Sequence, residues 1–210
     1  MVETYAQRGT PSLTSWCSSD PECDGKSSRI TLRASTIQDN FEQGWLGSGD
    51  DVVLERNRFL GNGTSTAFEH NIYWSNSQSP TFGGRIVGNE LYRSAAALSG
   101  SCEGGTFVSH GTHTDLLIEG NWVHEDVGAA LEGCWGITLT PTGATAEAFT
   151  GVVIRGNRVE NLGNLAIGVT SCVDCTIENN VVVAEQPFPG LAIAAPAPCA
   201  ARRTPSSPAS

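Results

Sequence analysis

One short phrase recurs along this chain, and its repetition constrains the fold more than any other feature. Each copy places aliphatic residues before a small or charged residue and a turn residue, and then adds a second apolar pair. The copies are LLIEGNWV (116–123), VVLERNRF (52–59), RIVGNEL (85–91), VVIRGNRV (152–159), CTIENNVV (175–182) and the weaker ITLRASTI (30–37). Self-similarity at a period of a few tens of residues is the signature of a solenoid.

The position of the turn residue gives the length of the repeating unit. It falls at Ser35, Asn57, Asn89, Asn121, Asn157 and Asn180, so the gaps are 22, 32, 32, 36 and 23 residues. The two shortest gaps define a unit of about 22 residues, and the longer gaps contain the same unit with insertions.

Each unit offers three short strands. A second apolar series lies between the Asn phrases, for example NIYWSN (71–76) and TFVSHG (106–111), and a third follows each Asn. Three strands per unit match an all-β, single-domain parallel β-helix of about 6 rungs, with aliphatic residues stacked inside. The Asn residues can stack as a ladder at a sharp bend, because Asn tolerates left-handed backbone angles and bonds its own turn.

The chain divides into three parts by composition. Residues 1–28 are polar and irregular and are expected to cap the first rung, and residues 29–186 carry the repeats. Residues 187–210 are rich in Ala and Pro and are expected to be a disordered tail.

The charge balance excludes several classes of partner. The formal net charge is −10 and Lys26 is the only lysine, whereas nucleic-acid binders need a basic surface. No apolar run is long enough to cross a membrane. An anionic polysaccharide remains open as a partner, because calcium can bridge carboxylates of protein and substrate. We expect a monomer.

The seven cysteines favour an oxidising compartment, secreted or periplasmic, although the N-terminus lacks the apolar core of a signal peptide. Cys17 and Cys23 are spaced for a local disulfide. Cys172 and Cys175 have C-x-x-C spacing inside a repeat, which favours a disulfide or buried thiols over a redox motif.

The Asn phrases over residues 29–186 resemble those of the right-handed parallel β-helix superfamily that includes the pectate lyases. The superfamily contains polysaccharide lyases, glycoside hydrolases, uronan epimerases and non-catalytic adhesins, so the resemblance implies the fold and not one activity. It implies a substrate groove along one sheet, over outward side chains and long inserted turns. In this chain the enlarged rungs end near Asn89, Asn121 and Asn157.

The first candidate site lies at Glu69 and His70, immediately before the strand at 71–76. A Glu beside a His could orient it as a general base. Tyr73 and Trp74 alternate on the strand, so one of them points outward and could stack on a sugar ring. The alternative is that Trp74 fills the core and that Glu69 and His70 lie in an ordinary turn.

The second candidate site is the polar segment SHGTHTD at 109–115. His110 and His113 could transfer protons to or from a sugar, or bind a metal together with Asp115. The alternative is a polar turn. Further possible calcium ligands are Glu103, Glu125, Asp126 and Glu132, which could equally form a solvated acidic turn.

Many lyases of this superfamily use Lys or Arg to neutralise the uronate, but Lys26 lies outside the repeats. Arg85 and Arg93 are the substrate-binding candidates that remain. The first hypothesis is therefore a lyase or hydrolase acting on a uronic-acid-containing glycan. The second hypothesis is a non-catalytic glycan-binding or structural surface protein, or a fragment of such a protein. An enzyme requires His110, His70 and an acid in one groove, whereas scattered positions favour binding or structure.

Overall fold

The computed structural model describes residues 3–4, 27–63, 69–93, 105–129, 133–141, 147–163, 165–186 and 190–195. These residues form an all-β structure with parallel strand pairing, as the sequence predicts. One turn of 3-10 helix, η1 (Val127–Ala129), is the only helical element in the described ranges.

Three sheets contain nearly all the strands. Sheet I consists of β3 (Thr31–Arg33), β7 (Val53–Glu55), β10 (Arg85–Val87), β13 (Leu117–Glu119), β17 (Val153–Arg155) and β21 (Thr176–Glu178). Sheet II consists of β1 (Glu3–Thr4), β4 (Thr36–Gln38), β8 (Arg58–Leu60), β11 (Glu90–Tyr92), β14 (Trp122–His124), β18 (Arg158–Glu160) and β22 (Val181–Val183). Sheet III consists of β5 (Trp45–Leu46), β9 (Ile72–Phe82), β12 (Gly105–Thr114), β15 (Trp135–Leu139), β16 (Phe149–Thr150), β19 (Leu165–Val169), β20 (Cys172–Val173) and β23 (Leu191–Ala194). A short additional pair joins β2 (Ser27–Ser28) to β6 (Gly49–Asp50).

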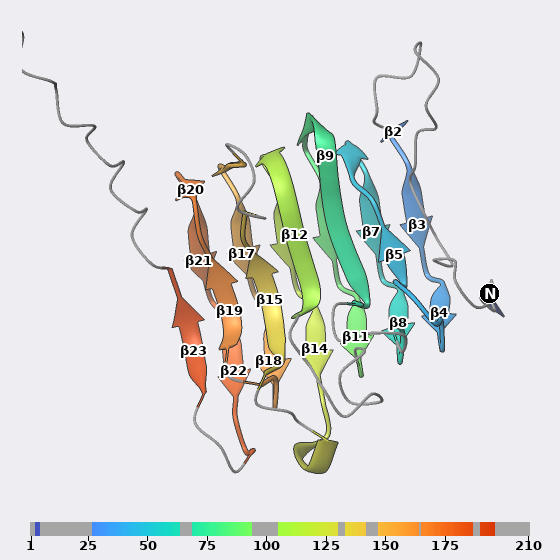
Figure 1. Cartoon of the computed structure of the whole chain (residues 1–210), viewed down its shortest axis with the longest axis vertical. Helices are drawn as coiled ribbons and strands as arrows, with labels where there is room; N and C mark the ends of the chain where they lie inside the picture. Colours follow the sequence, from blue (N-terminus) through green and yellow to red (C-terminus); the bar gives the residue numbers. More distant parts are fainter. Residues whose placement is uncertain are drawn as a thin grey trace, which may run out of the picture.

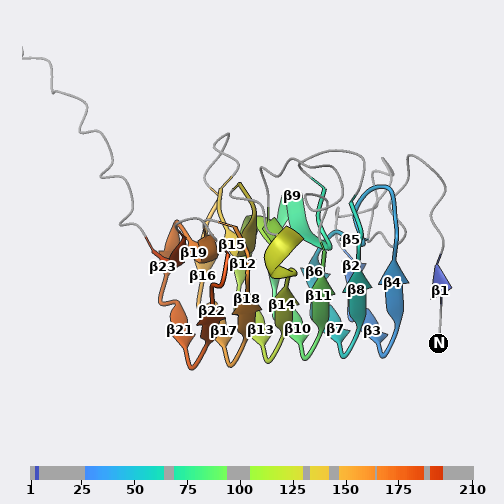
Figure 2. The ribbon, with the colours of Figure 1, turned by 90° about the horizontal axis from the view of Figure 1, so that it is seen from below.

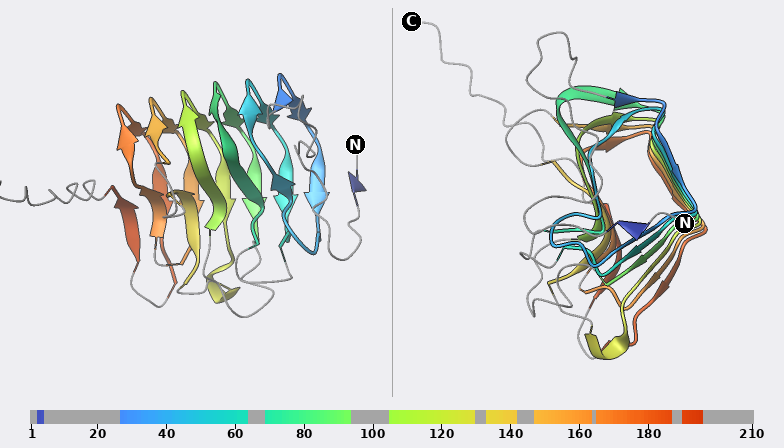
Figure 3. Two further views of the ribbon diagram at one scale, coloured as in Figure 1. Left: turned by 45° about the horizontal axis from the view of Figure 1, so that its top comes forward. Right: turned by 90° about the vertical axis from the view of Figure 1, so that its right-hand side faces the viewer.

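The chain runs through sheets I, II and III in turn and then returns to sheet I. Each circuit adds one strand to sheet I beside the strand of the preceding circuit (Figure 1). The sharp corners between sheets I and II therefore follow one another in a row (Figure 2), and the circuits superimpose when viewed along the stack (Figure 3).

In sheets I and II the core side chains come mainly from the central residue of each strand. In sheet I, Ile86 is opposite Leu54 and Ile118, and all three are at most 1% exposed. Phe59, Leu91 and Val123 form the equivalent row in sheet II. Full burial of such a side chain stabilises the fold by about 1.5–3 kcal/mol, so the repeated rows dominate the stability of the stack.

The ladder of asparagines at the corner between sheets I and II is confirmed. The Nδ2 of each of Asn57, Asn89, Asn121 and Asn157 donates to the Oδ1 of the next Asn at 2.9–3.1 Å. The same Oδ1 also accepts the backbone N–H of the preceding corner, as between Asn121 and Asn157 at 2.9 Å. Both hydrogen-bonding groups of the buried amide are thus used, which a low-dielectric interior requires.

The left-handed residue at this corner is the one before the Asn, contrary to the expectation that Asn itself adopts this conformation. Gly88, Gly120 and Gly156 have φ between 62° and 64°, and Arg56 has φ 53° at the equivalent place. Glycine adopts these angles without steric cost, which explains why it precedes the Asn in three of the copies.

A second set of stacked amides lies at the corner between sheets II and III. Asn62 Nδ2 donates to Asn71 Oδ1 at 2.8 Å, and Asn40 Nδ2 donates to Asn62 Oδ1 at 2.5 Å. The Nδ2 of Asn71 continues the chain to the carbonyl of Tyr92 at 3.1 Å. This corner therefore also has a defined position in successive circuits.

The ends of the chain bear on the expected divisions. From the segment 1–28 the structure describes β1, which pairs with β4, and residues 27–28, while Cys17 and Cys23 lie outside the described residues. The segment from residue 187 onward is not a disordered tail throughout, because β23 (Leu191–Ala194) pairs in parallel with β19. Residues 196–210 lie outside the described ranges.

Cys172 and Cys175 form a disulfide, with their Cα atoms 5.9 Å apart. Cys134 is disulfide-bonded as well.

Replacing both Cys172 and Cys175 by serine is expected to lower the free energy of unfolding by about 2 kcal/mol, because the bond closes a very short loop in the unfolded chain. Urea unfolding of the wild type and of the double variant, each without reductant, measures the difference in the free energy of unfolding. A loss above about 4 kcal/mol would contradict the loop-closure account.

Candidate functional site

The outward face of sheet III brings together three of the expected site residues. On β9, Trp74 faces the core and is fully buried, whereas Tyr73 faces outward and is half-buried. His70 precedes β9, and His110 lies on β12, which pairs with β9. The expectation that one of Tyr73 and Trp74 points outward is met by Tyr73, and Trp74 offers no surface to a sugar.

The rings of His70, Tyr73 and His110 form one cluster. The centroids of His70 and Tyr73 are 5.3 Å apart with an interplanar angle of 66°. Those of Tyr73 and His110 are 5.5 Å apart and perpendicular. Tyr73 therefore lies between two imidazoles, and we call these three residues the histidine–tyrosine cluster.

Hydrogen bonds to backbone carbonyls orient both imidazoles. The Nδ1 of His70 donates to the carbonyl of Gly105 at 2.7 Å, and the Nδ1 of His110 donates to the carbonyl of Thr140. A carbonyl only accepts, so each Nδ1 carries the proton and Nε2 of each neutral ring keeps its lone pair. Both histidines thus present Nε2 as the basic atom.

A third residue, Gln43, links Glu69 to the backbone of His70. Gln43 Nε2 donates to the Glu69 carboxylate, while Gln43 Oε1 accepts the backbone N–H of His70 at 2.6 Å. The connection between Glu69 and His70 that the structure describes therefore runs through Gln43 to the main chain. Its role is to fix the place of His70 at the start of β9.

The surroundings of His70 and Tyr73 shift the pKa values of these two groups in opposite directions. Burial, helped by the nearby His110, lowers the pKa of His70 to about 4, so His70 is neutral at pH 7. Burial also raises the pKa of Tyr73, and the carboxylates of Glu147 and Glu69 raise it further. A neutral imidazole next to a protonated phenol is a base beside an acid. The sequence drew no attention to Glu147.

His113 belongs to the core and not to the cluster. It is 1% exposed, its Nε2 donates to the carbonyl of His110 at 2.7 Å, and its Nδ1 accepts from the Thr81 hydroxyl at 2.6 Å. Its ring packs on Phe149 at 5.9 Å. Since both nitrogens have partners within the protein, the geometry does not support His113 as a catalytic residue or as a metal ligand.

Two buried histidines predict a loss of stability in mild acid. The pKa of His70 and that of His113 are both lowered to about 4, chiefly by burial, whereas the unfolded chain has the ordinary value of 6.5. Between those values the unfolded state binds more protons, so stability is complete above pH 6.5 and falls as the pH drops toward 4. We expect a loss of about 2 kcal/mol per histidine at pH 5 relative to pH 7.

Urea unfolding of the wild type and of His70→Gln at pH 7 and pH 5 measures this effect. Gln keeps a donor for the Gly105 carbonyl but does not titrate, so the variant should lose about half of the pH dependence. An identical pH dependence in both proteins would show that His70 is not responsible.

Among the described residues, the acidic side chains expected to bind calcium do not form one group. Asp115 lies in the turn between sheets III and I, whereas Glu125 and Asp126 follow β14, where Glu125 is buried. Glu103 and Glu132 lie outside the described residues. Within the described ranges no three His, Cys, Asp or Glu side chains are arranged to hold a metal ion. The expected set of ligands therefore does not come together there.

The two arginines expected to bind substrate lie away from β9 and β12. Arg85 is on β10 in sheet I. Arg93 follows β11, donates to Asp126 at 2.8 Å and places its guanidinium 5.2 Å from the centre of the Tyr92 ring. Neither residue is thus part of the histidine–tyrosine cluster.

A second aromatic group, on the outward face of sheet II, was not predicted from the sequence. The ring of His124 stacks there on the rings of Tyr92 and Trp122. The repeat contains the signal, because the residue directly after each ladder Asn begins a strand of sheet II with an outward side chain. Trp122 after Asn121 occupies that position.

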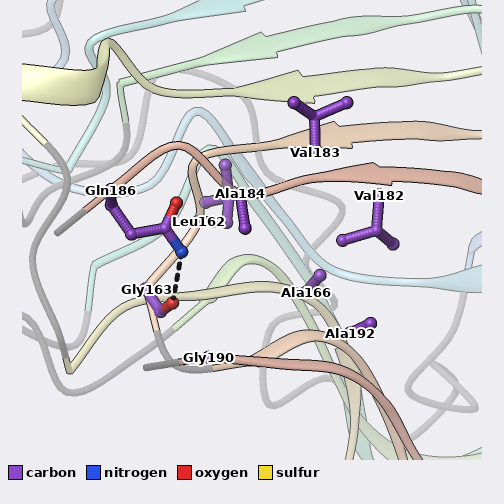
Figure 4. A pocket seen from close by; sticks show the side chains of 9 residues that line it. All are labelled: Leu162, Gly163, Ala166, Val182, Val183, Ala184, Gln186, Gly190 and Ala192. Atoms are coloured by element: carbon purple, nitrogen blue, oxygen red, sulfur yellow. Dashed lines mark hydrogen bonds between the residues drawn. The ribbon is translucent and has the colours of Figure 1, made fainter. Parts of the chain in front are cut away.

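A cavity of about 150 Å³ lies at the C-terminal end of the stack (Figure 4). Its walls are mainly apolar, including Leu162, Val182 and Ala192, and Gln186 donates to the carbonyl of Gly163 at 3.2 Å. None of the expected site residues lines it. The histidine–tyrosine cluster therefore remains the best-supported candidate for chemistry.

Comparisons of the chain with protein-family models, with curated proteins and with solved structures found no match. In the described part of the chain, no helix has the length and apolar character needed to cross a membrane.

Proposed function

We propose that the chain is a right-handed parallel β-helix and that it acts on a polysaccharide. The order of the strands supports the architecture, because each circuit contributes to the same parallel sheets in sequence order. Connections between parallel strands are right-handed in about 98% of cases. The buried Asn ladder supports the same interpretation.

The reaction that we propose is β-elimination in a uronic-acid-containing glycan. The observation that carries the proposal is the position of Tyr73 between two imidazoles whose Nε2 atoms are the basic ones. His110, which is only partly buried, would take the proton from C5 of the uronate, and the Tyr73 hydroxyl would protonate the leaving oxygen on C4. The C5–H and C4–O bonds break, and a C4–C5 double bond forms in the product.

Elimination fits the cluster better than hydrolysis does. Glycoside hydrolysis uses two carboxylates on either side of the scissile bond. Here Glu69 is hydrogen-bonded to Gln43, and the groups that gather around Tyr73 are imidazoles. These groups suit the removal of a proton next to a carboxyl group.

Calcium is part of the proposal as a substrate-side ion. A uronate carboxylate needs neutralisation before its C5 proton becomes acidic, and Arg85 and Arg93 do not belong to the cluster. A calcium ion bound between substrate and acidic side chains could supply this charge. The disulfide of Cys172 and Cys175 is compatible with the extracytoplasmic location that such a substrate implies.

The test is a screen of purified protein against pectate, alginate, other uronans and neutral glycans, with calcium or with a chelator. Ultraviolet absorbance of the unsaturated product reports elimination, and release of reducing ends without that absorbance reports hydrolysis. We expect absorbance on at least one uronan. Reducing ends alone would replace elimination by hydrolysis, and no product on any glycan from folded protein would overturn the enzymatic proposal.

A further inference from the structure

A stack of aromatic rings lies on the outward face of sheet II, on the neighbouring strands β11 and β14. His124 stacks on Trp122 with centroids 3.7 Å apart and an interplanar angle of 9°. It also stacks on Tyr92 at 4.6 Å and 18°. The Arg93 guanidinium lies 5.2 Å from the Tyr92 centroid. We call Tyr92, His124 and Trp122 the aromatic stack.

The stack is open to solvent at Trp122, which is 43% exposed. An exposed indole adds nothing to the packing of the core, and the repeat does not require a tryptophan at this position. The equivalent outward positions on the adjacent strands are Glu90 and Arg158. The repeat therefore needs only a residue that tolerates water at this position.

Three carboxylates around the rings hold them in place. Asp126 accepts from the Tyr92 hydroxyl at 2.7 Å, Glu90 accepts from His124 Nε2 at 3.3 Å, and Glu160 accepts from Trp122 Nε1. Each ring thus has a polar anchor at its edge. The stack is fixed before any ligand arrives, which reduces the entropy cost of binding.

Each of these carboxylates is also paired with an arginine. Arg93 donates to Asp126 at 2.8 Å, Arg58 donates to Glu90 at 2.7 Å, and Arg158 donates to Glu160 at 2.8 Å. The three positive and three negative charges cancel, so the surface has no strong preference for an ionic partner. It offers instead a flat apolar ring bordered by fixed hydrogen-bonding groups.

We infer that the aromatic stack is a binding site for a neutral polysaccharide chain. A pyranose ring has an apolar C–H face that packs on an indole, and hydroxyls around its edge that bond carboxylates and guanidinium groups. The stack and its charged border match both features. A charged polymer would find no unpaired counter-charge here, because each carboxylate at the border is already paired with an arginine.

The aromatic stack is separate from the histidine–tyrosine cluster, but one hydrogen bond connects the segments that carry them. Asn71, which follows His70, donates to the carbonyl of Tyr92 at 3.1 Å. The corner between sheets II and III thus connects the aromatic stack to the start of β9. The inference goes beyond the proposed function, because binding at the stack requires no catalysis at the cluster.

Affinity gel electrophoresis tests the inference with three probes: galactomannan and hydroxyethyl cellulose as neutral chains, and polygalacturonate as the charged comparison. We expect a neutral chain to retard the wild type, and Trp122→Ala to weaken that binding by about tenfold or more. Trp122→Phe should retain most of the affinity. Because an exposed ring and not a charge carries the contact, added salt should change little.

Val181→Ala is the matched control, since Val181 lies in the same outward row and is 48% exposed. It should bind like the wild type. Equal retardation of the wild type and Trp122→Ala, or no retardation by either neutral chain, would overturn the inference. Retardation by polygalacturonate alone would also overturn it while leaving the proposed elimination intact.

Discussion

Replacing His110 by alanine is expected to lower kcat by about 10²- to 10⁴-fold on any uronan that the wild type cleaves. The reason is the loss of the base that we place beside the Tyr73 hydroxyl. The fold should survive, because His113 donates to the backbone carbonyl of residue 110 and not to its side chain. Initial rates of product absorbance measure the loss, and thermal unfolding verifies the fold.

Thr112→Ala is the matched control for this prediction, since Thr112 lies on the same strand and is partly buried. It should leave kcat within about twofold of the wild type. Tyr73→Phe should remove the proposed acid and cause a loss of similar size. A His110→Ala variant that keeps full activity would exclude His110 as the base, even if the protein proves to be a lyase.

Replacing Asn121, one of the buried asparagines inside the ladder, by alanine is expected to cause a large loss of stability. Asn121 Oδ1 accepts both the backbone N–H and the Nδ2 of Asn89, at 2.9 and 3.0 Å. Its Nδ2 donates to the carbonyl of Ile86 and to Asn157. Buried groups left without partners cost about 1–3 kcal/mol each, so we expect a loss of about 3 kcal/mol or more in urea unfolding.

Asn180→Ala provides the control, because Asn180 is at the end of the ladder and is partly exposed. It also accepts two bonds, from the N–H and Nδ2 of Asn157, but water can reach that end more easily. We expect less than half of the effect of Asn121→Ala. Equal losses at both positions would mean that burial inside the stack contributes nothing to the ladder.

The architecture was accessible from the sequence because the same pattern returns in each circuit. The Asn residues mark one corner, and strands of fixed length on both sides then place Ile86, Ile118 and Ile154 in one row. Local alternation between core and solvent is enough to predict such rows. The second set of amides escaped notice because Asn62 and Asn71 both lie between β8 and β9, only nine residues apart, and so do not follow the spacing of the repeat.

The candidate site was less accessible, because its residues lie near insertions whose paths the repeat does not determine. The sequence indicated His70, Tyr73 and His110, but their meeting depends on the register that places His110 opposite Ser75. The sequence did not distinguish the outward-facing His110 from the core residue His113. Alternation along β12 turns residues three apart to opposite faces, so His110 is partly exposed while His113 faces the core.

The asparagine ladder also gives the stack an electrical direction. From Asn57 to Asn157, every side-chain amide turns its C=O toward the preceding circuit and one N–H toward the following circuit, so the amide dipoles are aligned head to tail. Parallel dipoles in a row reinforce one another, and strands contribute little net dipole to oppose them. The last circuit therefore carries the positive pole and the first circuit the negative pole, and the two ends of the molecule differ electrostatically even though the repeats between them are alike.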